Sequence, residues 1–298
     1  MDATLDTSLA TRNDTARLGY VAEGIDLSKD LDNATFRRIH DTFNANGVMV
    51  FRNQKISPEE HIRFSRRFGE LEIHVVDQYL LDGYPELFKI SNLMKDGKRV
   101  GASAEYWHSD LTYMAKPARC SLLHAIEIPR DDAGNPLGDT MFASTMMAYD
   151  ALPEAMKARI APLRGLHRLA DAYNRQNDRR EAGGQLRTAL EEEELRKRTP
   201  DVVHPVVRTH PYTGRKCLFV NEGFTVGIEG MAAAEGKALI RELHEHCMRP
   251  EFAYRHKWRA GDLVMWDNCS TVHSGTSDYG PEHRRLLYRT TVKGGVPV

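Results

Sequence analysis

The chain has no long hydrophobic run, and this absence excludes one class of protein at once. No purely apolar stretch exceeds about five residues, around Val48–Phe51, whereas a membrane-spanning helix needs about 20. The sequence also has no internal repeat and no low-complexity tract. We therefore expect a globular protein without a membrane partner.

An excess of charge of either sign is missing as well. The 41 Lys and Arg residues are balanced by 42 Asp and Glu residues, which gives a net charge of -1. Without a basic field over its surface, the protein is not expected to bind nucleic acid or an anionic membrane. A charged ligand must then be bound by a local site.

Cysteine is scarce, with four residues at positions 120, 217, 247 and 269. No pair has the CxxC spacing of a zinc knuckle or a thioredoxin motif. Scattered cysteines in a chain of this length are typical of reduced, intracellular proteins. The first residues lack the basic region and apolar core of a secretory signal, so we expect a cytoplasmic enzyme.

What is present is an ordinary globular composition, with 298 residues of which 41% are hydrophobic and 28% charged. We expect a flexible N-terminal tail over residues 1–19 and a single domain over residues 20–298. The stretch 167–204 is dense in Arg, Glu, Asp and Gln and has little apolar pattern. It is either a solvated insertion or a lid over a site.

Short strands bounded by turn residues dominate the predicted secondary structure. Asn33 as a cap and Gly47 as a stop predict one helix, and the capping box Ser57–Glu60 predicts another. Further helices are expected at about 153–162 and 232–247. Strands are expected over residues 48–51, 87–91, 121–128, 206–208, 218–220, 263–266 and 287–292. This pattern favours an antiparallel barrel or sandwich with helices.

Three polar groups have the chemistry of a metal site. His108 and Asp110 are two residues apart on an extended segment, so their side chains point to the same face and can bind one ion. Such a pair alone carries little weight in a chain with 13 histidines. His273 is a second histidine, and it follows a predicted buried strand. Farther on, Arg285 and Arg289 share one face of a strand-like segment, where they either bind a small dianion or pair with surface carboxylates.

Taken together, these motifs resemble the Fe(II)/2-oxoglutarate-dependent dioxygenases, in particular the branch of the taurine and 2,4-dichlorophenoxyacetate dioxygenases. The resemblance runs from about residue 20 to the C-terminus. The stretches that carry it are Phe64–Gly69, Trp107–Asp110, Gly138–Thr140, His204–Pro211, Leu218–Phe224, Met265–Asn268 and Arg285–Thr290. It implies a mainly β fold, the double-stranded β-helix (a jelly roll of the clavaminate synthase-like type) buttressed by α-helices.

The resemblance also implies a set of metal ligands and a cosubstrate. His108, Asp110 and His273 match the facial triad that binds Fe(II) and leaves three positions open. In such enzymes 2-oxoglutarate and O2 react to give succinate and CO2 while the substrate is hydroxylated. Where the attacked carbon bears oxygen, sulfur or nitrogen, the hydroxylated product breaks that bond.

Thr140 and Arg285 match the residues that contact the distal carboxylate of 2-oxoglutarate. One extra residue separates His273 from Arg285 compared with the common spacing, so Arg284 stays open as the alternative. Arg289 matches the arginine that binds the anionic group of the substrate in the taurine enzyme.

Four further residues match the substrate pocket or lie beside it. His74 matches a pocket histidine, with a loop histidine that binds nothing as the alternative. Phe219 and Asn221 match a wall segment, and Trp107 is either a pocket wall or a packing residue.

Two departures make taurine itself a doubtful substrate. Ala104 and Asp77 replace an Asn and a Tyr that help to surround taurine. If Asp77 faces the pocket, it would meet an amine or repel a second anion. We expect a small, anionic organic substrate and, by resemblance only, a homo-oligomer (dimer or tetramer).

Two other classes of protein stay open at this point. The same triad would suit a hydrolase or isomerase with Zn or Mn, although such an enzyme needs no dicarboxylate clamp of Thr140 and Arg285. A catalytically silent anion-binding protein is the other class, and the intact triad argues against it.

Overall fold

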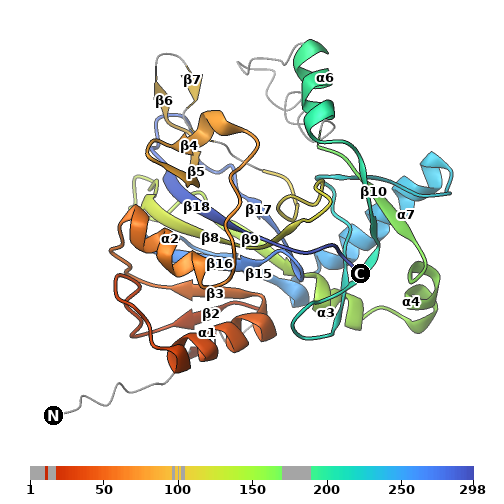
Figure 1. Cartoon of the computed structure of the whole chain (residues 1–298), viewed down its shortest axis with the longest axis horizontal. Helices are drawn as coiled ribbons and strands as arrows, with labels where there is room; N and C mark the ends of the chain where they lie inside the picture. Colours follow the sequence, from red (N-terminus) through yellow and green to blue (C-terminus); the bar gives the residue numbers. More distant parts are fainter. Residues whose placement is uncertain (1–10, 13–17, 96–97, 100, 102–104, 170–188) are drawn as a thin grey trace.

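The computed structural model describes residues 11–12, 18–95, 98–99, 101, 105–169 and 189–298. An eight-stranded sheet forms its centre (Figure 1). All neighbouring strands in it are antiparallel except β2 and β3. In sheet order the strands are β1 (Thr11–Arg12), β2 (Tyr20–Ala22), β3 (Val48–Phe51), β16 (Leu263–Asp267), β8 (Ala118–Glu127), β18 (Leu286–Lys293), β5 (Tyr84–Ser91) and β4 (Leu80–Leu81).

A smaller antiparallel sheet covers one face of the large sheet. It consists of β15 (Ala253–His256), β9 (Thr140–Ser144) and β17 (Thr271–Gly275). Phe142 from this sheet packs with Val264 and Trp266 of the large sheet in one buried cluster. Because strand side chains alternate between faces, Met265 points the other way and belongs to a different cluster. The functional side chains described below lie between the two sheets.

Two helices cover the opposite face of the large sheet, α1 (Asn33–Asn46) and α2 (Pro58–Arg66). Phe43 and Phe64 pack there against Met49 and Met265. The predicted stop of α1 at Gly47 is confirmed by its φ of 74°, a conformation that glycine adopts without strain.

The caps of these helices confirm one sequence prediction and correct another. The capping box of Ser57 and Glu60 is present in α2. The cap of α1 is Asp32 and not Asn33. An Asp32 oxygen accepts the N–H groups of Ala34 and Thr35, each at 2.8 Å, and Asn33 is already the first helical residue.

The remaining elements form a layer beside the sandwich and the rim of the site (Figure 1). Around one further apolar cluster lie α3 (Thr145–Asp150), α4 (Glu154–Ile160), α7 (Ala233–Cys247), β12 (Val207–Thr209), β13 (Lys216–Leu218) and β14 (Thr225–Ile228). Next to β14, β10 (Arg164–His167) and then β11 (Val202–Pro205) complete a three-stranded antiparallel sheet. The others are η1 (Asp77–Tyr79), η2 (Pro250–Phe252), β6 (Met94–Lys95), β7 (Lys98–Arg99) and α6 (Ala189–Arg198). Among the described helices, none has the length and apolar character to cross a membrane.

The two expected peripheral segments are described only in part. Within the expected tail, Thr11 and Arg12 pair with Val21 and Tyr20 as a short strand, and residues 1–10 and 13–17 lie outside the described residues. The expected insertion at 167–204 begins and ends at β10 and β11, which pair antiparallel. Its residues 170–188 also lie outside the described part.

Candidate active site

Three buried side chains, those of His108, Asp110 and His273, meet between the two sheets. One ligand atom of each lies within 4.8 Å of the others. His273 lies on β17, and the other two residues lie on the loop before β8. The main chains of His108 and His273 exchange two hydrogen bonds of 2.9 and 2.8 Å, which holds the ring centroids 4.2 Å apart. The structure thus brings together the three residues that the sequence pattern grouped.

The orientation of His108 leaves an electron pair directed at Asp110. His108 Nδ1 lies 2.8 Å from the carbonyl oxygen of Tyr106, and because a carbonyl only accepts, Nδ1 carries the proton. Burial lowers the pKa of His108, so Nε2 is unprotonated. It lies 3.8 Å from Asp110 Oδ1, too far for a hydrogen bond. Two acceptors that face each other in this way fit a cation between them.

Asp110 is held as an ionised carboxylate. Burial raises its pKa, but the charge of Arg289 and the hydrogen bond from Ser121 lower it, and the pKa lies well below the usual range. Arg289 NH1 is 2.7 Å from Oδ1, and Ser121 Oγ donates to Oδ2 at 2.6 Å. The Asp110 N–H donates to Asn268 Oδ1 at 3.0 Å. Two neutral imidazoles and one carboxylate are a donor set that suits Fe(II).

Ser121 and Asn268 were not predicted as site residues. Asn268 stands in one of the recognised stretches and Ser121 on a predicted strand. Only the folded chain shows that both reach Asp110, because they are 147 positions apart and bonded to each other at 3.0 Å.

Aromatic rings form the wall behind His108. The Tyr106 ring centroid lies 4.8 Å and the Phe224 centroid 5.8 Å from the imidazole. A Cβ on Gly223 would come within 2.9 Å of His108 Cβ, so only glycine allows this close approach. Trp107 is half-buried. Its main-chain carbonyl oxygen accepts the Gly223 N–H at 3.0 Å, which ties the Gly223 turn to the segment that carries His108. Tyr106 and Phe224 are thus the aromatic residues seen to contact the His108 ring.

Arg285 is a buried cation without a carboxylate partner among the described residues. Its NH2 donates to the carbonyl oxygen of Gly138 at 3.1 Å, and its Nε has no partner. Gly138 has a φ of 74°, and a Cβ there would lie 2.7 Å from Nε. Two residues on, Thr140 Oγ1 accepts from Trp258 Nε1 at 3.0 Å. A buried guanidinium needs an anion, so this corner fits the carboxylate of a ligand.

Arg284, the alternative to Arg285, points away from this corner. Its side chain is 63% exposed, and its Nε lies 2.8 Å from Glu127 Oε1. It is already paired at the surface.

A second arginine, Arg289, adjoins the triad from β18 and has an aromatic neighbour. Its guanidinium carbon lies 5.2 Å from the centroid of Phe88, and the His74 ring lies 4.3 Å from the same centroid. Burial and then Arg289 lower the pKa of His74 to about 3. His74 Nδ1 accepts the Val76 N–H at 3.0 Å, so the neutral ring carries its proton on Nε2 as a donor. The structure thus groups His74 with Arg289 and Asp110.

The structure also shows the surroundings of the other expected pocket residues. Asp77 is exposed at the start of η1. Phe219 packs against His167 and His204, with ring centroids 5.8 and 5.6 Å apart. Asn221 is buried, and its Oδ1 accepts the Phe224 N–H at 2.8 Å, so its visible role is to hold the turn that carries Phe224. Ala104 lies outside the described residues.

Comparison with known proteins decides the family. The family described as "Taurine catabolism dioxygenase TauD, TfdA family" matches residues 11–291. The chain belongs to this family. It is therefore an oxidoreductase, a dioxygenase that depends on Fe(II), 2-oxoglutarate and O2. The predicted reaction class is confirmed.

Individual relatives cover nearly the whole chain. The alpha-ketoglutarate-dependent 2,4-dichlorophenoxyacetate dioxygenase of Cupriavidus pinatubonensis is 36% identical, over 90% of this chain and 92% of the relative. An alkylsulfatase of Acinetobacter baylyi is 32% identical, over 97% and 86%. The structure of AAD-2 in complex with Mn(II) and N-oxalylglycine has a TM-score of 0.78 and 33% identity, over 97% and 98%. The predicted fold, a mainly β jelly roll with helices, is confirmed by this likeness.

Proposed function

We propose that His108, Asp110 and His273 hold the Fe(II) of this dioxygenase. The proposal is supported by the approach of their ligand atoms to within 4.8 Å and by the unprotonated Nε2 of His108 that faces the carboxylate. Bound Fe(II) supplies the oxidising chemistry, in which 2-oxoglutarate and O2 yield succinate, CO2 and a hydroxylated substrate. The chain's own contribution is to fix these three ligands and to exclude water.

We propose that Arg285, with Thr140, binds the distal carboxylate of 2-oxoglutarate. The buried guanidinium with its unpartnered Nε supports this assignment. Arg284 is unsuited, because Glu127 already neutralises it at the surface.

We propose that the substrate is a small organic anion, bound by Arg289 and His74. The single observation that carries this is the buried cation of Arg289 beside Asp110, with the half-buried neutral donor of His74 next to it. A cation bound at Asp110 would share that carboxylate and leave Arg289 with charge to meet a carboxylate, sulfonate or sulfate group. The substrates in the relatives' names, 2,4-dichlorophenoxyacetate, sulfate esters and phenoxypropionate, are anions of this kind.

The test is substrate-dependent succinate formation with a panel of carboxylates, sulfonates and sulfate esters. Arg289→Gln should raise the KM for the preferred anion about tenfold or more, because a charge-assisted hydrogen bond is lost. Arg284→Gln, which removes an exposed arginine two residues before the same strand, should leave KM unchanged. An unchanged KM in the Arg289 variant would refute the assignment.

Part of the segment 167–204 borders this pocket, and we propose that it covers the substrate as a lid. Leu195 of α6 packs in one cluster with Phe224 and Tyr106. Arg198 NH2 donates to the carbonyl oxygen of Val75 at 2.7 Å, one residue from His74. These contacts support the proposed position.

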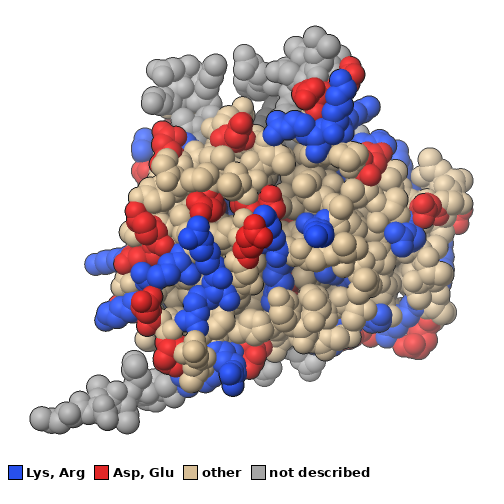
Figure 2. All heavy atoms as spheres, viewed as in Figure 1, with Lys and Arg blue, Asp and Glu red and all other residues tan. Residues whose placement is uncertain are grey.

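We further propose a cytoplasmic homo-oligomer that binds neither nucleic acid nor membranes. Four buried, unpaired cysteines support a reducing compartment. On the face that Figure 2 shows, acidic and basic side chains are interspersed and form no basic tract, in keeping with the net charge of -1. Light scattering after size-exclusion chromatography would measure the oligomeric state.

A further inference from the structure

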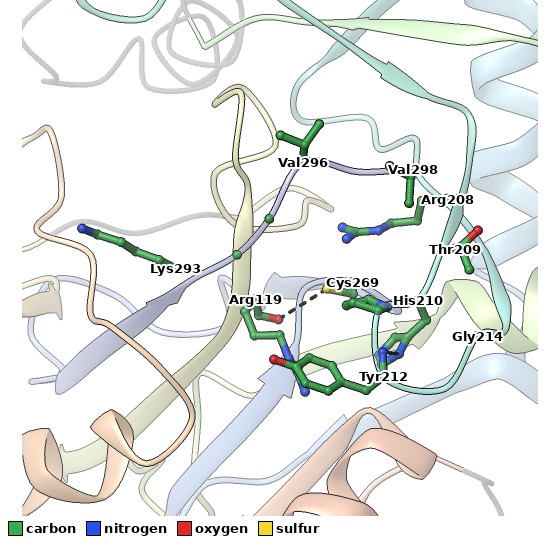
Figure 3. A pocket seen from close by; sticks show the side chains of 13 residues that line it. Arg119, Arg208, Thr209, His210, Tyr212, Gly214, Cys269, Lys293, Val296 and Val298 are labelled. Atoms are coloured by element: carbon green, nitrogen blue, oxygen red, sulfur yellow. Dashed lines mark hydrogen bonds between the residues drawn. The ribbon is translucent and has the colours of Figure 1, made fainter.

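Two buried arginines, Arg208 and Arg285, have no Asp or Glu within ion-pair distance in the part of the chain that the structure describes. Arg208 lies in a cavity of about 460 Å³ that Val298, the last residue of the chain, also lines (Figure 3). The Thr209 N–H donates to the carbonyl oxygen of Val298 at 2.5 Å. The terminal carboxylate is thus held beside Arg208 and supplies its counter-charge, whereas Arg285 is left for an external anion.

The Arg285 guanidinium rests on a single peptide unit, that of Gly138. Its NH2 donates to the Gly138 carbonyl oxygen at 3.1 Å. A Cβ at position 138 would lie 2.7 Å from Arg285 Nε and 2.9 Å from Tyr279 Cε1, so the main chain approaches the guanidinium as closely as glycine permits. The position of the Gly138 main chain therefore decides where the guanidinium points.

Asp278, on the loop between β17 and β18, holds this peptide from its other side. Its Oδ1 accepts the Gly138 N–H at 2.7 Å, and Thr276 Oγ1 donates to the same oxygen at 3.0 Å. A carboxylate that accepts a main-chain N–H forms a charge-assisted hydrogen bond, which is stronger than a neutral one. Gly138 is thus fixed between the Asp278 carboxylate and the Arg285 guanidinium.

Further contacts bind the next residue, Asp139, to the same loop. The Thr276 N–H donates to the Asp139 carbonyl oxygen at 2.9 Å. Arg255 Nε donates to Asp139 Oδ2 at 2.6 Å, and Arg255 NH2 lies 3.8 Å from Asp278 Oδ2. Because Thr140 follows directly, this loop places both side chains that we assigned to the distal carboxylate of 2-oxoglutarate.

The charged members of this network contribute little to stability. The side chain of Asp278 is 37% exposed and that of Arg255 is 50% exposed. Ion pairs that remain in contact with water add little to the free energy of unfolding. Their convergence on the Gly138 peptide therefore points to a role in the site.

We propose that Asp278 is a positioning residue for the cosubstrate. By holding the Gly138 N–H, it orients the Arg285 guanidinium toward the distal carboxylate of 2-oxoglutarate and so sets the preference for a keto acid with a second carboxylate. This inference rests on the assignment of Arg285 under Proposed function.

The test is anaerobic calorimetric titration of the full, Fe(II)-loaded chain with two keto acids. One is 2-oxoglutarate, and the other is 2-oxopentanoate, which has a methyl group in place of the distal carboxylate. Asp278→Ala should raise the dissociation constant of 2-oxoglutarate about tenfold, through the loss of one charge-assisted hydrogen bond, and leave that of 2-oxopentanoate within about twofold. In turnover, the KM for 2-oxoglutarate should rise while kcat at saturation stays the same.

Two variants serve as controls. Asp278→Asn keeps an oxygen that accepts the Gly138 N–H and should bind 2-oxoglutarate within about threefold of the wild type. Asp32 is also an exposed aspartate that accepts main-chain N–H groups, those of Ala34 and Thr35 at 2.8 Å. Asp32→Ala should lower the Tm without changing either dissociation constant.

The two keto acids distinguish positioning from a general loosening of the fold. A selective loss of 2-oxoglutarate affinity in Asp278→Ala, restored in Asp278→Asn, supports the proposal. Equal losses for both keto acids, or a loss in Asp278→Asn as large as that in Asp278→Ala, would overturn it.

Arg285→Gln separates a failure of this inference from a failure of the assignment on which it rests. That variant should lose about 100-fold or more of its affinity for 2-oxoglutarate and little of that for 2-oxopentanoate. If it does so while Asp278→Ala binds 2-oxoglutarate like the wild type, only the role of Asp278 is overturned. If Arg285→Gln keeps the wild-type preference, the assignment of Arg285 is wrong and this inference fails with it.

Discussion

Asp110 and Asp267 are two carboxylates in similar surroundings that perform different tasks. Both are buried, each lies beside one arginine and at least one histidine, and the pKa of each lies well below the usual range. The difference is in how the neighbouring histidine is protonated. His210 Nδ1 accepts the N–H groups of Tyr212 and Thr213 at 3.2 and 3.1 Å.

His210 must therefore donate from Nε2 to Asp267, and that contact is a closed hydrogen bond of 2.5 Å. His108 has the opposite tautomer, because its Nδ1 donates to a carbonyl. Its Nε2 therefore faces Asp110 as an acceptor at 3.8 Å. The same residue types thus build a closed structural ion cluster at one place and an open metal site at the other. The main-chain partner of Nδ1 decides between them.

The same substitution at the two histidines should separate these tasks most strongly. His108→Gln should reduce succinate formation and Fe(II) affinity by more than about 100-fold, because the loss of a ligand exceeds that of an outer-shell partner. His210→Gln should leave Fe(II) affinity within a fewfold and lower the Tm. Fe(II) titration and thermal unfolding of both variants measure this, and similar losses of iron binding in both would contradict the comparison.

The next largest effect should be on stability at Asp267. Arg119 is buried and its guanidinium lies 3.1 Å from Asp267 Oδ1. Asp267→Asn leaves Arg119 without this counter-charge, which should cost about 3–5 kcal/mol of unfolding free energy. Urea denaturation measures this loss, with Asp150→Asn as control because Asp150 pairs with Arg215 at the surface. A loss at position 267 no larger than that of the control would show that the cluster is not structural.

A smaller effect is expected at the hydroxyl that orients the metal ligand. Ser121→Ala removes the donor to Asp110 Oδ2 and should weaken Fe(II) binding by about 10–100-fold. Ser65→Ala is a matched control, because Ser65 is equally buried and bonds to His61 and Thr290 instead. Iron affinity that is the same in both variants would remove Ser121 from the site.

The smallest effect concerns stability at low pH. His61, a buried histidine that belongs to neither the Asp110 nor the Asp267 cluster, contributes to it. Burial and then His124 lower the pKa of His61 to about 3, while an unfolded histidine titrates near about 6.5. The unfolded chain binds more protons between these values, so stability falls as the pH drops through this window. His61→Met should make the unfolding free energy fall less steeply as the pH is lowered, whereas His40→Gln should leave this pH dependence unchanged. Equal slopes in the two variants would refute this.

Much of the fold could be predicted from local patterns. Gly47, the Ser57 capping box and the apolar strands 48–51 and 263–266 match the observed elements. The smaller sheet was missed: β9 and β17 carry Thr140 and His273 but are five residues long. Thr271–Gly275 mixes Thr, His and Ser without a clear alternation, and its burial comes from the opposing sheet.

The candidate site was predictable for residues whose type itself indicates their chemistry, such as metal-ligating histidine and aspartate. His108, Asp110 and His273 were grouped by motif, and the structure places them together. The contributions of Ser121 and Tyr106 were not predicted. A serine hydroxyl and a main-chain carbonyl gain their role only from the contacts that the fold creates.

The most direct test of this account is an anaerobic titration of the full chain with Fe(II) and then 2-oxoglutarate, followed by visible absorption. The account predicts one Fe(II) per chain and a charge-transfer band on adding 2-oxoglutarate, in the wild type and His210→Gln but not in His108→Gln. A folded wild type without the band, or a band that survives in His108→Gln, would contradict it.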